Sequence, residues 1–168
     1  MRNVIAVYVE NKYGVLTRVA GLIMRRGFNI DTLTVGETEN PDYSRITITM
    51  QGDDYVRTQI TRQLKKLHNV KEVKLLERGD SVERELLLVK VKNSAGTRSE
   101  IITAADVYRG KIIDYSTDAI MIEVTGEPNK IQAFIDVLRP LGILEMCRTG
   151  VVALQRGSEA LATTENFS

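Results

Sequence analysis

Apolar and polar residues alternate along the chain in a pattern that predicts strands and helices in a fixed order. Residues 4–9 form a continuous apolar run, which is typical of a strand buried on both faces. The next segment has apolar residues at helical spacing, at Leu16, Val19, Ala20 and Ile23. Gly27 follows, a residue that readily adopts the left-handed conformation that ends a helix. Strict alternation then predicts strands over residues 29–37 and 43–51.

The pattern completes one unit and then begins again. Asp53 or Asp54 is placed to cap a second helix, and a strand is predicted over residues 70–76. A linker-like segment follows at residues 77–81. The elements predicted after it are a strand at 85–92, a helix at 99–108 stopped by Gly110, strands at 111–116 and 119–125, a helix that begins at Pro128 and is ended by Arg139 and Pro140, and a strand at 145–154 interrupted at Gly150.

These two series share one order, strand-helix-strand-strand-helix-strand, over about 75 residues each. The sequence therefore predicts an α+β protein made of two ferredoxin-like βαββαβ units, at residues 3–78 and 82–157. The polar segment at 158–168 is expected to be a disordered tail. Each unit covers only one sheet face with helices, and units this small are marginal alone. We expect the sheet edges and open faces to be closed by another subunit.

Composition and charge narrow the functional classes. The chain has 168 residues, 43% of them hydrophobic, with 23 basic and 22 acidic residues and a formal net charge of +1. Nothing in this balance attracts the whole chain to nucleic acid or to anionic lipid. No apolar run reaches the roughly 18 to 20 residues that cross a bilayer, and the N-terminus leads directly into a strand. We expect a cytoplasmic protein with neither a nucleic-acid nor a membrane partner.

The side chains needed for common catalytic and metal sites are scarce. Cys147 is the single cysteine and His68 the single histidine, so no internal disulfide, zinc site or histidine-based triad is predicted. We expect Cys147 to be a small buried apolar residue and His68 to be exposed. Residues 43–51 lack the exposed aromatic side chains of an RNA-recognition motif, and no Cys-x-x-Cys motif precedes the first helix as in a metal chaperone. We predict no catalytic residue and no metal ligand.

One loop remains as a candidate binding site, at Asn11 to Gly14. A helix that begins near Gly14 has unpaired backbone N–H groups and a partial positive charge at its start, which suit an anion. Asn11 can offer its amide to a carboxylate or an ammonium group, and we expect Asn29, after Gly27, to face the same loop. The same residues also occur in ordinary strand-to-helix turns. The spacing alone leaves both interpretations open.

Four blocks in order along the chain resemble one family. They are ENKYGVLTRVAGLIMRRGFNIDTLTVGETENPDYSRITITMQGDD, VERELLLVKV, YRGKIIDYS and RTGVVALQRG. Together they resemble the regulatory small subunit of acetolactate synthase, also called acetohydroxyacid synthase. The resemblance runs from residue 4 to residue 157.

The resemblance implies an N-terminal ACT domain at residues 3–78, which pairs side by side with a second copy and holds an amino-acid effector at the interface. It implies a homodimer that binds and activates a catalytic large subunit, and that confers feedback inhibition by valine or another branched-chain amino acid. Thiamine diphosphate, Mg²⁺ and FAD are expected in that partner, and no cofactor in this chain. The effector residues of the family correspond to Asn11, Gly14, Val15, Leu16, Asn29 and Ile30.

Two other functions remain as alternatives. One is a stand-alone ACT-domain sensor that regulates another enzyme or transcription. The blocks VERELLLVKV and RTGVVALQRG oppose it, because they lie outside the ACT domain. The other alternative is an enzyme in its own right, which would form acetolactate from pyruvate without a large subunit.

Overall fold

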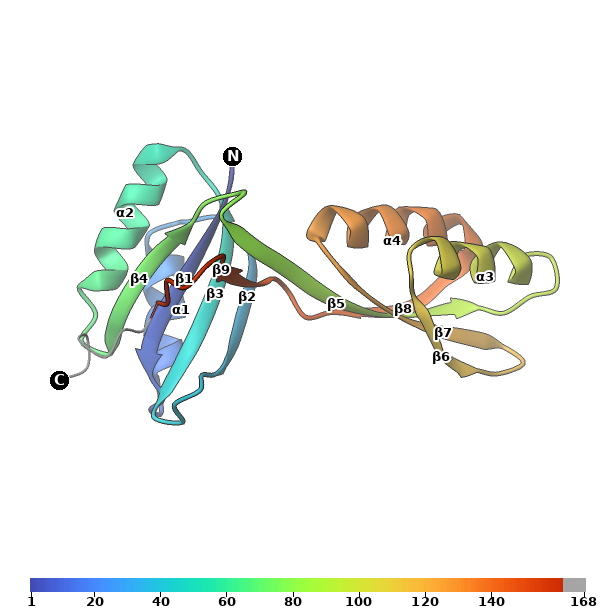
Figure 1. The fold of residues 1–168 in the computed structure, drawn as a ribbon, viewed down its shortest axis with the longest axis horizontal. Helices are drawn as coiled ribbons and strands as arrows, with labels where there is room; N and C mark the ends of the chain where they lie inside the picture. Colours follow the sequence, from blue (N-terminus) through green and yellow to red (C-terminus); the bar gives the residue numbers. More distant parts are fainter. Residues whose placement is uncertain (162–168) are drawn as a thin grey trace. The chain divides into compact units, whose positions relative to one another are not determined.

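The computed structural model describes residues 1–161, and the contacts within it divide the chain into two compact units (Figure 1). One unit comprises residues 1–82 together with the segment that begins at Val151, and the other comprises residues 83–150. This division groups residues 151–157, which were expected in the second domain, with the first unit. Of the predicted disordered tail, residues 162–168 lie outside the described part of the chain.

The first unit has the predicted order of elements. They are β1 (Arg2–Glu10), α1 (Val15–Arg25), β2 (Ile30–Glu37), β3 (Tyr43–Gln51), α2 (Asp54–Lys65) and β4 (Val70–Leu76). The four strands form an antiparallel sheet in the order β2-β3-β1-β4. Helix α2 begins where the side chain of Asp53 accepts a hydrogen bond from the amide of Val56 at 3.0 Å. Gly27 has a φ of 68°, as its predicted role at the end of α1 requires.

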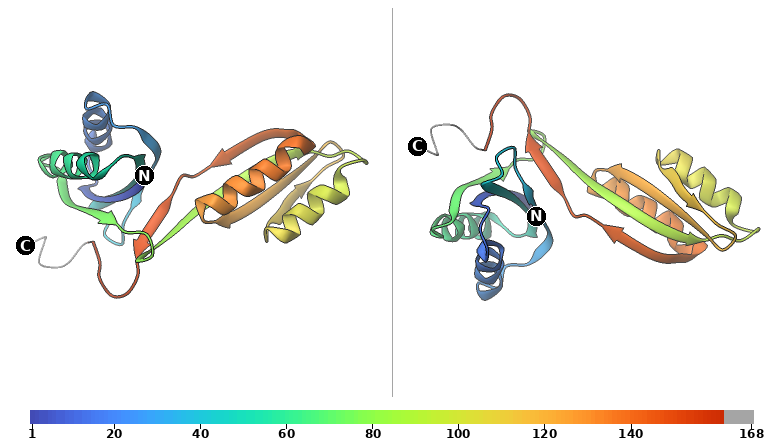
Figure 2. Two further views of the ribbon diagram at one scale, coloured as in Figure 1. Left: turned by 90° about the horizontal axis from the view of Figure 1, so that it is seen from above. Right: turned by 90° about the horizontal axis from the view of Figure 1, so that it is seen from below.

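Helices α1 and α2 cover one face of the first sheet (Figures 1 and 2). On that face Ile5, Val7 and Val9 of β1 pack in a core with Val19 and Ile23 of α1 and with residues of α2, β3 and β4. The alternate residues of β1 are buried on the other face. Both faces of β1 are therefore covered, as its continuous apolar run predicts.

The cover on the second face comes from the chain itself. Strand β9 (Val152–Gln155) lies on the side of the sheet opposite α1 (Figures 1 and 2). Val151 and Ala153 pack there against Val4, Ala6 and Leu76, with Leu161 beside them. The side chain of Arg45 in β3 donates a hydrogen bond to the carbonyl oxygen of Ala153 at 2.7 Å. This face, which we expected another subunit to close, is thus partly closed by residues 151–161.

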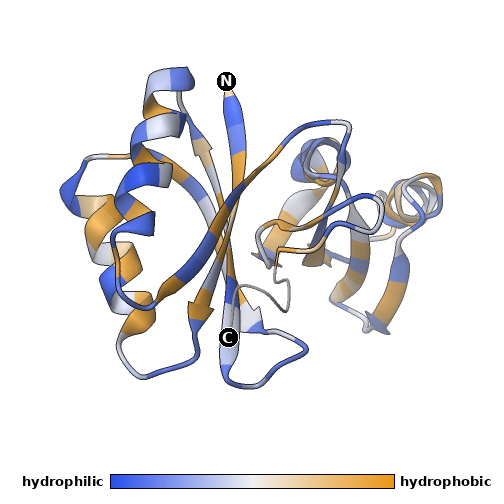
Figure 3. Cartoon of the chain, turned by 60° about the vertical axis from the view of Figure 1, so that its left-hand side comes forward, coloured by the Kyte–Doolittle hydropathy of each residue, from blue (hydrophilic) through white to orange (hydrophobic). Residues whose placement is uncertain are grey.

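The second unit repeats the order of elements with a different core. They are β5 (Ser81–Lys92), α3 (Arg98–Val107), β6 (Lys111–Tyr115), β7 (Ala119–Gly126), α4 (Pro128–Gly142) and β8 (Ile143–Arg148). The strand order is β6-β7-β5-β8. Phe134 and Leu138 of α4 are fully buried against Leu87 of β5 and Ile122 of β7. In both units, the strands carry hydrophobic as well as hydrophilic residues (Figure 3).

Three predictions for the second unit need correction. Helix α4 continues through Pro140 and ends at Gly142, which has a φ of 99°. Proline removes one backbone donor, but its own φ is compatible with a helix. The left-handed residue after α3 is Arg109, with a φ of 57°, and not Gly110. Gly110 is needed for space, since a Cβ there would lie 2.8 Å from a side-chain carbon of Val124.

Cys147 is exposed, although the sequence analysis predicted it to be buried. It lies in β8, opposite Leu88 of β5. Leu88 alternates with Leu87 and Val89, which face the helices, so Leu88 and Cys147 share the face without helices. The strand pattern around Cys147 was read correctly, but the face was not.

Candidate functional site

The loop from Asn11 to Gly14 connects β1 to α1 and leaves the beginning of the helix open. Gly14 precedes α1 with a φ of 83°, no side chain caps the helix, and its first turn has no acidic residue. The amides of Leu16 and Thr17 have no partner within the helix, and the helix dipole adds partial positive charge. A Cβ on Gly14 would meet no atom within 4 Å. The loop therefore presents donors to open space, which suits a carboxylate.

Asn11 anchors this loop to the turn between β2 and β3. Its side-chain nitrogen donates hydrogen bonds to the carbonyl oxygen of Pro41 at 2.9 Å and to Oε1 of Glu37 at 3.4 Å. Its backbone N–H donates to the carbonyl oxygen of Asp42 at 2.7 Å. Asn11 is nevertheless exposed, and its side-chain oxygen is an acceptor for a ligand ammonium group.

A group of charged residues at Glu10 holds the base of the loop. Lys12 and Lys71 each place Nζ 2.9 Å from one of its carboxylate oxygens, and Asn69 donates to it at 3.2 Å. Arg18 of α1 in turn donates to the side-chain oxygen of Asn69. The hydrogen bonds from Lys71, Lys12 and Asn69, in that order, lower the pKa of Glu10 to about 2. The carboxylate therefore stays charged at neutral pH and ties β1 to β4.

Sequence reasoning missed this group. Lys71 and Asn69 are about 60 residues from Glu10 along the chain, and only the pairing of β1 with β4 brings them together. The sole local signal was a charged residue at the end of an otherwise apolar strand.

The apolar residues predicted with the loop differ in accessibility. Val15 is only 3% exposed and packs in the core of the first unit, so its backbone is the part that can contact a ligand. Leu16 is 43% exposed and its side chain is accessible. Ile30 is partly buried and packs against the same core.

Asn29 lies at the opposite end of the sheet from the loop, so the expectation that both face one point in a single chain is wrong. Strand β1 ends at Glu10, which pairs with Tyr43 at the start of β3. The first residue of β2, next to Asn29, pairs with Met50 near the end of β3. Helix α1 has 11 residues and separates the two points by about 16 Å. The crossover must travel this length because β1 and β2 run in the same direction.

The described part of the chain offers little for other functions. Residues 1–161 contain no group of three or more His, Cys, Asp or Glu side chains placed to bind a metal ion. Within the same residues, no helix is long and apolar enough to cross a membrane.

Comparison with known proteins finds relatives over nearly the whole chain. Residues 5–72 match the family model described as the AHAS small subunit-like ACT domain, and residues 84–157 match that of the small subunit of acetolactate synthase. The chain is 51% identical over 160 residues to the probable acetolactate synthase small subunit of Methanothermobacter thermautotrophicus, covering 95% of each chain. It is 46% identical over 161 residues to the acetolactate synthase small subunit of Mycolicibacterium smegmatis, covering 96% of this chain and 95% of the other.

A solved structure gives the same result. The crystal structure of the acetolactate synthase small subunit from Thermotoga maritima matches with a TM-score of 0.88 at 40% identity, covering 95% of this chain and 99% of the other. The prediction of two ferredoxin-like units in an α+β protein is confirmed.

Proposed function

Since the chain belongs to the family of acetolactate synthase small subunits, which implies a regulatory role beside a catalytic large subunit, we propose a specific form of that regulation. The chain activates the large subunit and makes it subject to feedback inhibition by valine. The observation that carries this proposal is the β1–α1 loop, which has open backbone donors and an exposed asparagine but no catalytic side chain.

A homodimer formed through the edge of β2 is part of the proposal. Among residues 1–161, strand β2 has β3 on one side and no strand on the other, and Val35 on it is 41% exposed. If two copies pair their β2 strands antiparallel about a two-fold axis, the start of one strand comes beside the end of the other. Asn29 of the partner subunit then approaches Asn11 and Gly14 of this one. Such a dimer has two equivalent effector sites.

Valine has the chemistry that this composite site requires. Its carboxylate binds the amides of Gly14 and Leu16, since the amide of Val15 already donates to the carbonyl oxygen of Lys12 at 3.3 Å. Its ammonium group donates to the side-chain oxygens of Asn11 and of Asn29 of the partner subunit. The isopropyl group packs against Leu16 and Ile30. Another branched-chain amino acid has the same two charged ends and differs only in this last contact.

Feedback inhibition requires that valine bind one state of the holoenzyme more tightly than another. A preference of about 100-fold for the inhibited arrangement supplies about 2.7 kcal/mol. That is enough to reverse a modest bias towards the active arrangement. Thiamine diphosphate, Mg²⁺ and FAD belong, in this proposal, to the large subunit, and the isolated chain forms no acetolactate from pyruvate.

The decisive experiment replaces Gly14 by aspartate and measures acetolactate formation by the reconstituted holoenzyme with and without valine. Gly14→Asp places a fixed negative charge where the carboxylate of valine binds, so activation is retained and inhibition is lost. Gly14→Asn is the matched control, because asparagine has the same size and tolerates a positive φ but has no charge. It retains more of the valine response than Gly14→Asp. Unchanged inhibition in Gly14→Asp would remove the loop from the effector site.

Mixed dimers test the composite site. Asn29→His, like Gly14→Asp, is expected to abolish valine binding in a pure dimer. In a dimer with one chain of each kind, one site carries both substitutions and the other carries neither. Half of the valine sites therefore return, which calorimetry on the purified mixed dimer measures. A mixed dimer that binds no valine would show that each site lies within one chain.

A further inference from the structure

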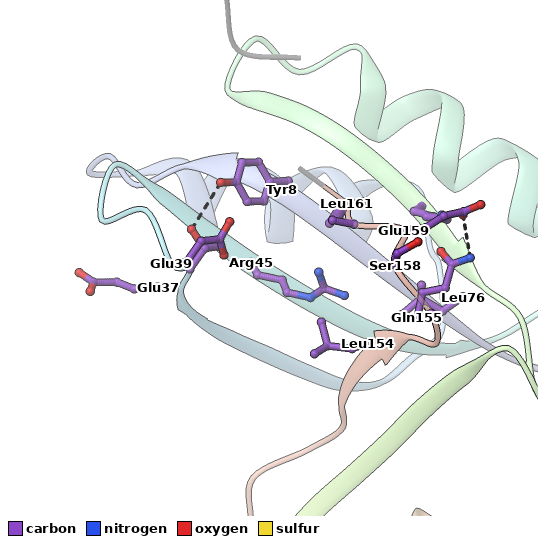
Figure 4. Close-up of a pocket in the computed structure, with 14 residues that line it drawn as sticks. Tyr8, Glu37, Glu39, Arg45, Leu76, Leu154, Gln155, Ser158, Glu159 and Leu161 are labelled. Atoms are coloured by element: carbon purple, nitrogen blue, oxygen red, sulfur yellow. Dashed lines mark hydrogen bonds and ion pairs between the residues drawn. The ribbon is translucent and has the colours of Figure 1, made fainter. Parts of the chain in front are cut away.

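A cavity of about 560 Å³ lies in the first unit, between its sheet and the segment at residues 154–161 (Figure 4). Tyr8, Arg45 and Leu76 form its floor, on the face of the sheet opposite α1 and α2. The volume is within the range of sites for small molecules. One chain alone forms this cavity, and none of the residues proposed for the valine site lines it.

Arg45 presents an unpaired positive charge to this cavity. Its guanidinium group extends from β3 into the space below Leu161 and Ser158 (Figure 4), and one of its five N–H donors is used by the carbonyl oxygen of Ala153. No carboxylate of the described residues forms an ion pair with it. Burial lowers the pKa of Arg45, an effect that Glu39 partly opposes. A partly buried cation with no carboxylate of the described residues in direct contact is costly, and a ligand carboxylate would offset that cost.

Negative charge lines one end of the same cavity. Glu37 and Glu39 lie on the side of Tyr8 (Figure 4). On the other side, Glu159 is already paired with Lys74 at 3.2 Å. A simple anion at Arg45 would be repelled by the two unpaired carboxylates, whereas a ligand with an ammonium group would be attracted to both ends.

The remaining walls are aliphatic. Leu76, Leu154 and Leu161 surround the guanidinium group of Arg45 (Figure 4). Leu154 is 64% exposed, so an apolar ligand group against it would remove that surface from water.

We propose that this cavity is a second ligand site, for a free α-amino acid with an aliphatic side chain. The carboxylate of the ligand binds Arg45, the ammonium group binds Glu39 and Glu37, and the side chain packs against Leu154 and Leu161. The proposal does not depend on the valine site at the β1–α1 loop. Glu37 lies next to both, because it also accepts the hydrogen bond from Asn11.

The test uses calorimetry on the full chain with L-leucine as the probe. The Gly14→Asp variant isolates the cavity, and one molecule of leucine is expected to bind per chain. Adding Arg45→Met lowers the affinity about tenfold or more, because charge-assisted hydrogen bonds are lost. Arg62→Met, an exposed arginine on α2, is the matched control and leaves binding unchanged. Equal affinity with and without Arg45→Met would overturn the proposal.

Two leucine analogues test the need for both charges. 4-Methylpentanoate lacks the ammonium group and 3-methylbutylamine lacks the carboxylate, so each binds about tenfold or more weakly than leucine. If 4-methylpentanoate binds as tightly as leucine, the role of Glu37 and Glu39 is wrong and so is the class of ligand.

A second variant keeps the test valid if Arg45→Met fails to fold. Leu154→Trp adds bulk at an exposed position and fills the cavity, so leucine binding is lost while the fold is retained. The chain has no other tryptophan, and its fluorescence therefore reports on this position alone. Retained leucine binding when Leu154→Trp is combined with Gly14→Asp would overturn the proposal. If Gly14→Asp abolishes leucine binding and Arg45→Met retains it, the loop site is supported and the cavity site is rejected. If Arg45→Met abolishes leucine binding and Gly14→Asp retains it, the cavity site is supported and the loop site is rejected.

Discussion

The two units share one order of elements, yet the loops that open their first helices differ. In the first unit Asn11 is exposed. In the second unit the corresponding Asn93 is only 7% exposed. Its side-chain nitrogen donates to the carbonyl oxygen of Ser116 at 2.7 Å, and its side-chain oxygen accepts from Nε of Arg98 at 2.8 Å. The second loop is thus satisfied by its own chain.

This difference shows why a repeated fold need not repeat a binding site. The sheet and helices bring both loops to the same relative position, and neither helix has a side-chain cap, but only in the first is the asparagine exposed. In the second, Ser94 and Thr97 also hydrogen-bond to each other through their hydroxyl groups at 2.7 Å. A ligand would have to break these bonds before it formed its own.

The faces opposite the helices differ as well. Residues 151–161 cover part of that face in the first unit, where Val151 is 1% exposed. In the second unit Leu88 on this face is 37% exposed and Cys147 is also exposed. The first sheet is therefore stabilised on both faces by its own chain.

The largest expected loss of stability comes from placing a charge between the first sheet and residues 151–161, which cover part of it. Val151→Asp buries a carboxylate among apolar residues and is expected to cost about 3 kcal/mol or more of unfolding free energy. Leu88→Asp is the matched control in the second unit and costs about 1 kcal/mol or less, because that position is partly exposed. Urea unfolding of both variants measures the difference. Equal destabilisation would mean that residues 151–161 do not protect the first sheet.

The next largest loss of stability is expected when the buried side chain of Asn93 is removed. Asn93→Ala leaves the carbonyl oxygen of Ser116 and Nε of Arg98 without their partner, at a cost of about 2 kcal/mol. Valine inhibition of the holoenzyme is expected to keep its midpoint, because the proposed valine site does not include the second loop. A thermal melt together with an inhibition curve checks both halves of this prediction.

Asn11→Ala is expected to reduce valine affinity much more than stability. Because Asn11 is exposed, its loss costs about 1 kcal/mol or less, while valine affinity falls about tenfold through the lost contact with the ammonium group. Calorimetry and urea unfolding on the same protein separate the two quantities. A large loss of stability with unchanged valine affinity would make the first loop structural, like the second.

The smallest expected effect on stability is the contribution of the Glu10 carboxylate, which is lost only in acid. The pKa of Glu10 is lowered from 4.5 to about 2 in the folded chain, so its stabilising contribution is present above pH 4.5 and is lost as the pH falls towards 2. Glu10→Gln lacks this contribution. The melting temperatures of wild type and Glu10→Gln should therefore differ at pH 6 and converge only as the pH falls to about 2. A constant difference across this range would show that the charge of Glu10 is not what holds the loop.

Much of the architecture was predictable because the strands, helices and helix ends follow from local sequence patterns. The apolar run at residues 4–9 predicted a strand covered on both faces, and Asp53 and Gly27 mark the ends of helices where expected. The loop at Asn11 to Gly14 was found from the same kind of signal. Its function needed the resemblance of four separate blocks, since glycine and asparagine occur in many turns.

Other features depend on contacts between distant residues. The position of Asn29 follows from the direction in which β2 runs, and the charged group at Glu10 follows from its pairing with β4. Periodicity indicates that a side chain is buried, but not which segment buries it. For this reason the packing of Val151 and Ala153 against the first sheet was not predicted, and Cys147 was placed on the wrong face.

By itself the sequence determined the order of the elements, the internal repeat and the family, because alternation, glycine positions and motif blocks are local properties of the chain. Tertiary structure alone decided that the predicted effector residues Asn11 and Asn29 lie at opposite ends of one sheet, and that residues 153–161 lie over Arg45. Both features depend on which strands pair and which faces pack together. Hydrophobic burial is non-directional and selects no particular partner segment, so the pattern of apolar residues along the chain does not specify either feature.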